Sequence, residues 1–190
     1  MKVPIFIKQI IPFVFLYSCL IFISIGLDYL LHYLNLFYIG RYLGPIGTVF
    51  ILFSFIYSLN KHKSIHIGSS PQLLKIHETL AFIGSILILV HAGIHFNAIL
   101  PWLAILSLLI NVASGLVGKF ILKMANLDLL SNRKELVSSG MSESEIEKNL
   151  SFDSIVVKGL KKWRMIHLPI AYTLGILSLL HLISILIFSS

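Results

Sequence analysis

The sequence predicts an all-α membrane protein in which five apolar helices cross the bilayer as a single transmembrane domain. Of the 190 residues, 57% are hydrophobic and only 12% are charged, and the mean hydropathy is +0.92. A soluble domain of this size has too little interior to bury so much apolar surface. Five apolar runs are long enough to cross about 30 Å of hydrocarbon. We place them at residues 10–31, 43–59, 76–98, 100–122 and 165–188.

The first span begins close to the start of the chain and must be distinguished from a cleaved signal. Lys2 and Lys8 precede an apolar run of eighteen residues, Ile10–Leu27. This run is longer than the apolar region of a signal peptide and lacks a small-x-small exit, which predicts a retained span. Near its outer end, Asp28 and His32 lie one turn apart. They form either a proton-exchanging pair or, as we expect, a local polar pair.

The later spans follow from the segments between them. The loop Asn97–Pro101 is too short to hold a domain, so the third and fourth spans form a helical hairpin. The connection 123–164 is polar and cytoplasmic, and it holds six of the eight acidic residues. Within it, Ser142 and Glu145 have the spacing of a capping box, which predicts a helix from there to Trp163. We expect this helix to lie at the lipid headgroups; a docking site for a partner is the alternative.

Basic residues are distributed unequally between the two sides of this arrangement. Of the fifteen Lys and Arg residues, only Arg41 falls on one side of the five spans. Because cytoplasmic loops carry the excess of Lys and Arg, the N-terminus is predicted inside and the C-terminus outside. Membrane topology therefore explains the formal charge of +7, and nucleic-acid binding is not expected. We expect an integral protein of a bacterial inner membrane, in contact with lipid.

Four histidines stand inside two of the spans at matching intervals. His77 and His91 are fourteen residues apart in the third span, and His167 and His181 are fourteen apart in the fifth. At about 100° and 1.5 Å per residue, each pair shares one helix face, with about 21 Å between its members. Since both spans run from inside to outside, His77 is level with His167, and His91 is level with His181. One such histidine is often only a satisfied polar group, but the repeated spacing indicates a functional site.

Two imidazoles on opposite faces of a flat macrocycle are the axial ligands of a six-coordinate haem. The spacing therefore predicts two b-type haems in a four-helix bundle of spans two to five. One haem is assigned to His77 and His167, and the other to His91 and His181. The sequence has no CxxCH motif, and Cys19 is its only cysteine. Ordinary covalent haem attachment is thus excluded, and we expect Cys19 to be a buried packing residue.

His95 is four residues after His91 and shares its helix face. It lies about 6 Å nearer the outer surface, so His91 matches the depth of His181 better and is preferred as the ligand. His95 is then an interfacial residue, or it contacts a haem propionate or a quinone. A zinc site is not favoured, because two histidines do not complete a tetrahedral site and no acid or cysteine stands nearby.

Basic residues and glycines close to the histidines are further candidates. Lys75 and Arg164 precede the inner ligands, and Arg41 is the one basic residue outside. All three are candidates for binding haem propionates, although Lys75 and Arg164 are explained more simply as anchors at the membrane edge. Gly84 and Gly175 lie between the paired histidines. A missing side chain there lets a helix approach a macrocycle or, more commonly, another helix.

This histidine arrangement resembles the di-haem cores of cytochrome b and of ferric-reductase-like membrane proteins, in which two parallel spans each contribute one such pair. The run R-M-I-H-L-P around His167, with H-L-I at His181, is similar to the fourth core helix of cytochrome b. The resemblance covers Leu43–Phe188 and implies a ligand role for His77, His91, His167 and His181. The sequence shows no flavin or nicotinamide domain and no PEWY-type quinol motif, and it carries an additional first span.

We therefore expect a cytochrome that carries electrons across the bilayer between a quinone or quinol pool and a redox partner protein, as a subunit of a larger respiratory complex. One alternative is a ferric-reductase-like enzyme that reduces an external acceptor at the outer haem, for which chelated iron would rapidly reoxidise the protein. The other is a proton or metal transporter that uses Asp28, His32 and His95 as a relay, and its absorption spectrum would lack haem.

Overall fold

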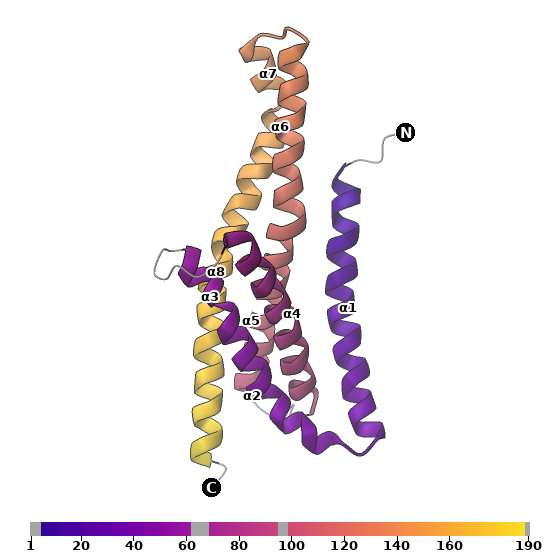
Figure 1. Ribbon diagram of the computed structural model, residues 1–190, viewed down its shortest axis with the longest axis vertical. Coiled ribbons are helices and arrows are strands. Elements are labelled where there is room, and N and C mark those ends of the chain that lie inside the picture. Colours follow the sequence, from indigo (N-terminus) through magenta and orange to yellow (C-terminus); the bar gives the residue numbers. More distant parts are fainter. Residues whose placement is uncertain (1–4, 62–68, 95–98, 189–190) are drawn as a thin grey trace. The chain divides into compact units, whose positions relative to one another are not determined.

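The structure, a computed structural model, describes residues 5–61, 69–94 and 99–188, and these residues are almost entirely helical. Figure 1 shows the helices in chain order. They are α1 (Ile5–Tyr33), α2 (Phe37–Ser54), α3 (Ile56–Lys61), α4 (Ser70–Ile94), α5 (Ile99–Leu116), the π-helix η1 (Val117–Leu122), α6 (Lys123–Ser138), α7 (Glu143–Asn149) and α8 (Ser151–Phe188).

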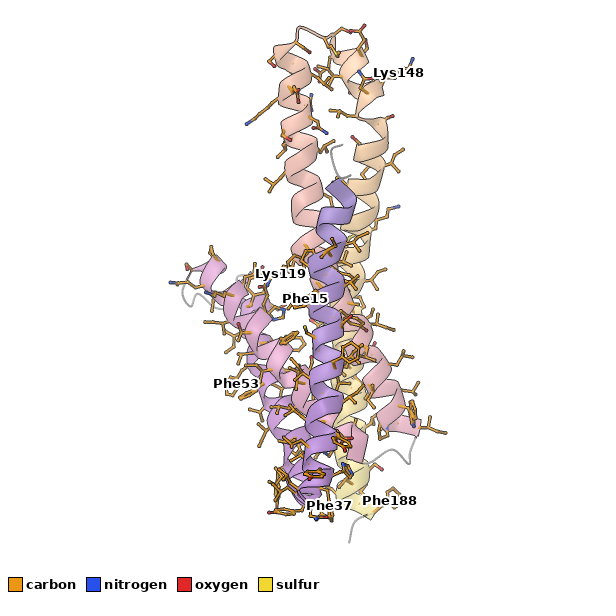
Figure 2. All side chains as sticks on the ribbon, turned by 90° about the vertical axis from the view of Figure 1, so that its right-hand side faces the viewer. Phe15, Phe37, Phe53, Lys119, Lys148 and Phe188 are labelled. Atoms are coloured by element: carbon orange, nitrogen blue, oxygen red, sulfur yellow. The ribbon has the colours of Figure 1, made fainter. Side chains whose placement is uncertain are left out.

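Within the residues that the structure describes, five helical segments are long and apolar enough to cross a membrane, which confirms the predicted fold class. They are Ile10–Tyr33, Phe37–Ser58, Pro71–Gly93, Ile99–Phe120 and Met165–Phe188. The second and third begin about one and a half turns earlier than predicted, because the helices continue through the polar residues at the membrane edge. Large apolar side chains such as Phe15 and Phe188 project from the helices (Figure 2) and are 64% and 82% exposed. The chain is an integral membrane protein whose outer faces suit contact with lipid.

The chain divides into two compact units. The first comprises residues 1–17 and 113–172, and the second comprises residues 18–112 and 173–190. In the second unit α2 and α4 pack against each other along their lengths. The turn from α1 to α2 is tight, because Asn35 adopts a positive φ of 55°. The N–H of Leu36 then donates to the carbonyl of Leu31 at 2.8 Å, which closes the end of α1.

In the first unit, α6 and the beginning of α8 form a hairpin that α7 closes (Figure 1). The predicted capping box is present at the start of α7. The N–H and the hydroxyl of Ser142 donate to the carboxylate of Glu145 at 3.0 and 2.8 Å. Ile146 and Leu150 are buried beneath this turn, and Arg133 forms an ion pair with Glu143. Polar caps and two apolar contacts therefore define the tip of the hairpin.

The helix predicted from the capping box to Trp163 is wrong in its extent. α7 ends at Asn149, and a new helix begins at Ser151 and continues without a break into the fifth span. α8 therefore has 38 residues and a length of about 57 Å, which exceeds the roughly 30 Å of hydrocarbon. Lys residues are good helix formers, so the basic run before Met165 extends the helix instead of ending it. Residues 151–164 are thus not a separate helix lying at the headgroups.

Acidification is expected to loosen the tip of the hairpin. The Ser142 hydroxyl, and secondarily its N–H, hold the pKa of Glu145 below its usual value. Because the folded-state pKa is the lower one, this stabilisation is present above the unfolded pKa of about 4.3 and is lost as the pH falls through the folded pKa. Amide hydrogen exchange at residues 142–146, corrected for intrinsic rates, should therefore accelerate on acidification.

Glu145→Gln is the matched control for this effect. Its side chain keeps an acceptor oxygen for the capping box but does not titrate. The variant should show no acceleration of its own between neutral and acidic pH. Equal acceleration in the wild type and in Glu145→Gln would mean that Glu145 is not the group responsible.

Candidate functional site

The site is organised by the point at which α2 and α4 cross. A Cβ atom on Gly47 would lie 2.8 Å from the backbone oxygen of Gly84, and a Cβ atom on Gly84 would lie 2.8 Å from the oxygen of Gly47. Two glycines therefore face each other where the two backbones come closest. The sequence allows Gly84 to face either a macrocycle or another helix, and in the structure it faces α2.

His77 and His91 each donate a hydrogen bond from Nδ1 to a backbone carbonyl oxygen of α2. His77 Nδ1 lies 3.0 Å from the oxygen of Ser54, and His91 Nδ1 lies 2.8 Å from the oxygen of Gly40. The predicted sharing of one face of α4 is therefore found in the structure. The spacing is symmetrical about the crossing point. The histidines are seven residues before and after Gly84, and their partners are seven residues after and before Gly47.

Each of the two carbonyl groups has a reason to accept this bond. Ser54 is the last residue of α2, so its oxygen is one of the four at a helix end that no N–H of the same helix satisfies. Gly40 has no side chain to shield its oxygen, and a carbonyl has a second lone pair beyond the one used within the helix. Gly40 and Ser54 are both buried, and the two hydrogen bonds are part-buried.

These two hydrogen bonds determine the state of the imidazole rings. A carbonyl oxygen only accepts, so Nδ1 of each ring must carry the proton and donate it. In a neutral imidazole Nε2 then has the lone pair, which is the form that binds a metal. When one ring nitrogen of a histidine binds a metal, a hydrogen bond from the other nitrogen, such as these Nδ1 bonds, fixes the orientation of the ring. The geometry of His77 and His91 therefore fits two imidazole ligands.

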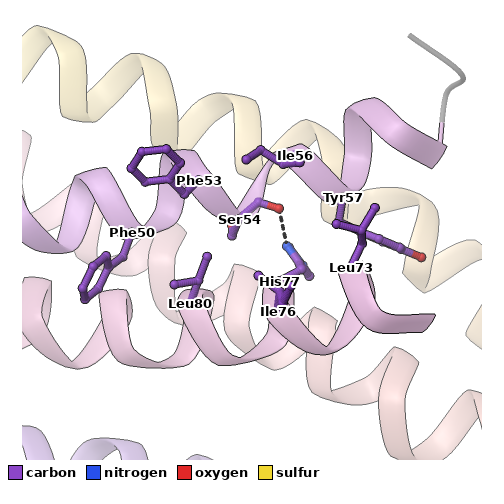
Figure 3. Close-up of a pocket in the computed structure, with 9 residues that line it drawn as sticks. All are labelled: Phe50, Phe53, Ser54, Ile56, Tyr57, Leu73, Ile76, His77 and Leu80. Atoms are coloured by element: carbon purple, nitrogen blue, oxygen red, sulfur yellow. Dashed lines mark hydrogen bonds between the residues drawn. The ribbon is translucent and has the colours of Figure 1, made fainter. Parts of the chain in front are cut away.

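A cavity of about 320 Å³ lies beside His77. Figure 3 shows its lining, in which the Ser54–His77 bond stands among apolar and aromatic side chains. The ring of Tyr57 lies 5.5 Å from the ring of His77, tilted by 31°. The lining residues are Phe50, Phe53, Ser54, Ile56, Tyr57, Leu73, Ile76, His77 and Leu80. An apolar pocket with one imidazole suits a large, flat, apolar ligand.

His91 has a different neighbour on α2. A Cβ atom on Gly44 would lie 2.5 Å from Cδ2 of His91 and 2.8 Å from its Nε2, so the ring occupies the space above a missing side chain. Arg41 directly follows Gly40, the residue that binds His91, and its side chain is exposed. This candidate for a propionate therefore belongs to the same end of α2 as the partner of His91.

In the first unit, the buried Ser114 of α5 binds His167 of α8. Ser114 Oγ lies 2.6 Å from His167 Nδ1, and a Cβ atom on Gly115 would lie 3.5 Å from Cε1 of the same ring. A hydroxyl can act as donor or acceptor, so the Ser114 oxygen can accept a hydrogen bond from the Nδ1–H of His167, as the two carbonyl oxygens do from His77 and His91. His77, His91 and His167 are thus each held at Nδ1.

The other predicted site residues lie in less defined surroundings. His181 is half-buried on α8, and Lys75 is exposed on α4. Nothing lies within 4 Å of where a Cβ atom of Gly175 would be. Arg164 lies on α8, and His95 falls outside the described residues. The pairing of His77 with His167 and of His91 with His181 stays a prediction.

The predicted local pair at the end of α1 is found. His32 Nδ1 donates to the backbone oxygen of Asp28 at 2.9 Å and lies 3.5 Å from the carboxylate Oδ1. The carboxylate of Asp28 also packs against Gly93 of α4, where a Cβ atom would lie 2.9 Å from Cγ. The pair is therefore bonded locally and placed against the helix that carries His91.

The sequence reasoning missed the partners of the histidines. Gly40, Gly47 and Ser54 follow one another at intervals of seven residues, which repeats the spacing of His77, Gly84 and His91 on the facing helix. This matching interval of small residues was the available signal. Ser114 has no comparable signal, because serine is also a common packing residue in membrane helices.

Among the described residues, no group of three or more His, Cys, Asp or Glu side chains gathers as a metal site. Comparisons with protein-family models, with curated proteins and with solved structures find no match to this chain.

Proposed function

We propose that the protein is a di-haem b-type cytochrome that carries electrons across the membrane. The observation that supports it best is the pair of Nδ1 bonds on α4, because they orient the rings of His77 and His91 and assign the proton on Nδ1 of each. Haem bound at these positions would supply a one-electron iron couple near each face of the bilayer. The apolar cavity beside His77 suits a large apolar ligand at the level of that histidine.

The polar residues have secondary roles in this proposal. Lys75 and Arg164 are assigned to the propionates of the inner haem and Arg41 to those of the outer one, because a buried carboxylate needs a cation near it. The N-terminus is placed in the cytoplasm and the C-terminus outside, in a bacterial inner membrane. Imidazole on both faces of the iron leaves no open coordination position, which favours electron transfer over oxygen chemistry.

Electrons must enter and leave through other molecules, because the sequence shows no further redox motif. We assign a quinone or quinol to one side and a redox partner protein to the other. The protein would then act as a subunit of a larger respiratory complex. The ordered histidines would serve to hold both irons at fixed depths, about 21 Å apart along α4.

Transfer across the membrane is tested with purified protein in liposomes that contain trapped ferricyanide. Dithionite is added outside, and the absorbance of ferricyanide inside is followed. The proposal expects rapid loss of ferricyanide in liposomes with the wild type and slow loss in empty liposomes. His77→Ala, which removes one of the two irons from the path, should be close to the empty liposomes. A rate in His77→Ala equal to that of the wild type would contradict the proposal.

His95→Ala is expected to leave two haems per chain. His95 lies about one turn beyond His91 and therefore not at the depth of His181. Replacing His95 should thus not remove a haem ligand. Haem is counted after extraction with alkaline pyridine, with His91→Ala measured beside it. A loss of one haem in His95→Ala, with none in His91→Ala, would reverse the assignment of the ligand.

A further inference from the structure

The bond between Ser114 and His167 fixes the register of two helices at the inner end of the spans. α5 with η1 and α8 pass this point in opposite directions, as the hairpin in Figure 1 requires. Lys119 lies five residues after Ser114, and Lys162 lies five residues before His167. Both residues are therefore about 7 Å from the bond, on the same side of it. Lysines of two separate helices are thus brought to one level.

The charges around this level have one sign. The exposed basic residues there are Lys119, Lys158, Lys161 and Lys162, which we call the basic collar. Neither residues 79–127 nor residues 154–190 contain an aspartate or a glutamate. The acidic residues of the hairpin lie in residues 128–153, so its charges are separated along its length.

The depth of the collar matches the headgroup layer. The fifth span begins at Met165, which is 68% exposed. Lys162 and Lys158 are three and seven residues before it, or about 4.5 and 10.5 Å along the helix. The headgroup region on each side of a bilayer is about 5–7 Å thick. A lysine stem is long enough for its ammonium to reach phosphate groups from either position.

We propose that the basic collar is a binding surface for the phosphate groups of anionic phospholipids. The collar combines exposed ammonium groups, one sign of charge and headgroup depth on two adjacent helices, and each such residue near the surface strengthens attraction to anionic lipid. This surface does not depend on haem. An acidic protein partner is the competing occupant, and the experiment below separates the two.

The test uses full-length protein in nanodiscs of phosphatidylcholine with a minority of phosphatidylglycerol. Spin-labelled forms of both lipids report how strongly each is immobilised at the protein. The collar variant Lys158→Gln/Lys162→Gln is compared with Lys134→Gln/Lys148→Gln, which removes the same charge from the distant part of the hairpin. All four lysines are exposed, and glutamine has nearly the same helix propensity as lysine, so both variants should fold.

The wild type should prefer phosphatidylglycerol, and the collar variant should lose at least about threefold of this preference. The distant variant should keep it, and about 0.5 M salt should remove it from the wild type, because salt screens exposed charges. Equal losses in both variants would overturn the proposal, since net charge alone would then explain the effect. The proposal would also be overturned if the wild type showed no preference for phosphatidylglycerol, or if the collar variant kept that preference. Either result would leave an acidic protein partner as the occupant.

Discussion

Replacing His91 by Ala is expected to reduce the haem content from two to one per chain. The variant removes the imidazole that Gly40 orients at 2.8 Å, and alanine supplies no atom able to bind iron. The inner ligand, His77, lies seven residues before Gly84, whereas His91 lies seven residues after it. His77 has its own partner, the carbonyl group of Ser54. Because Gly40 and Ser54 are separate partners fourteen residues apart on α2, most of the second haem should remain.

The haem absorbance of reduced His91→Ala should be about half that of the wild type, because one of the two haems is lost. His32→Ala is the matched control, since it removes another histidine from the same unit, at a position bonded to its own helix. It should leave the haem content unchanged. Loss of both haems in His91→Ala, with a helix content equal to that of the wild type, would contradict the independence of the two sites.

Replacing Gly47 by Ala is expected to destabilise the protein and to weaken both haem sites together. The added Cβ atom would lie 2.8 Å from a backbone oxygen, which cannot move without moving α4. Overpacking of this kind costs about 1–3 kcal/mol. Separating the helices at the crossing also draws the carbonyl groups of Gly40 and Ser54 away from the two imidazoles.

Thermal unfolding in detergent and haem content measure the two effects. Gly26→Ala is the control, because nothing lies within 4 Å of a Cβ atom there and alanine favours a helix over glycine. Gly26→Ala should unfold at or above the temperature of the wild type, whereas Gly47→Ala should unfold several degrees lower. If Gly47→Ala is as stable as Gly26→Ala, the close crossing of α2 and α4 is not a property of the folded protein.

The spans were predictable because the requirements of a bilayer are simple. A helix that crosses it must be apolar over a fixed length, and this pattern is readable in runs such as Met165–Phe188. The ends of helices were less predictable. α8 begins fourteen residues before its span, since lysines that mark the membrane edge do not stop a helix.

The site was predictable only in part, for a related reason. Helical periodicity indicates which histidines share a face, and His77 and His91 do so. Periodicity does not show which helix that face meets. The partners of the histidines are backbone carbonyl groups, which every residue has, so no side chain at Gly40 or Ser54 marks them. For the same reason, Gly84 could be read as facing either a macrocycle or a helix until Gly47 was found opposite to it.

In the proposed cytochrome, four histidines hold two haems. The most direct measurement is a pyridine haemochrome assay on purified, folded protein, with the haem content divided by the chain concentration. We expect two b-type haems per chain, released without covalent attachment. A colourless protein with the helix content of the wild type would contradict it and would leave a transporter as the better explanation of the histidines.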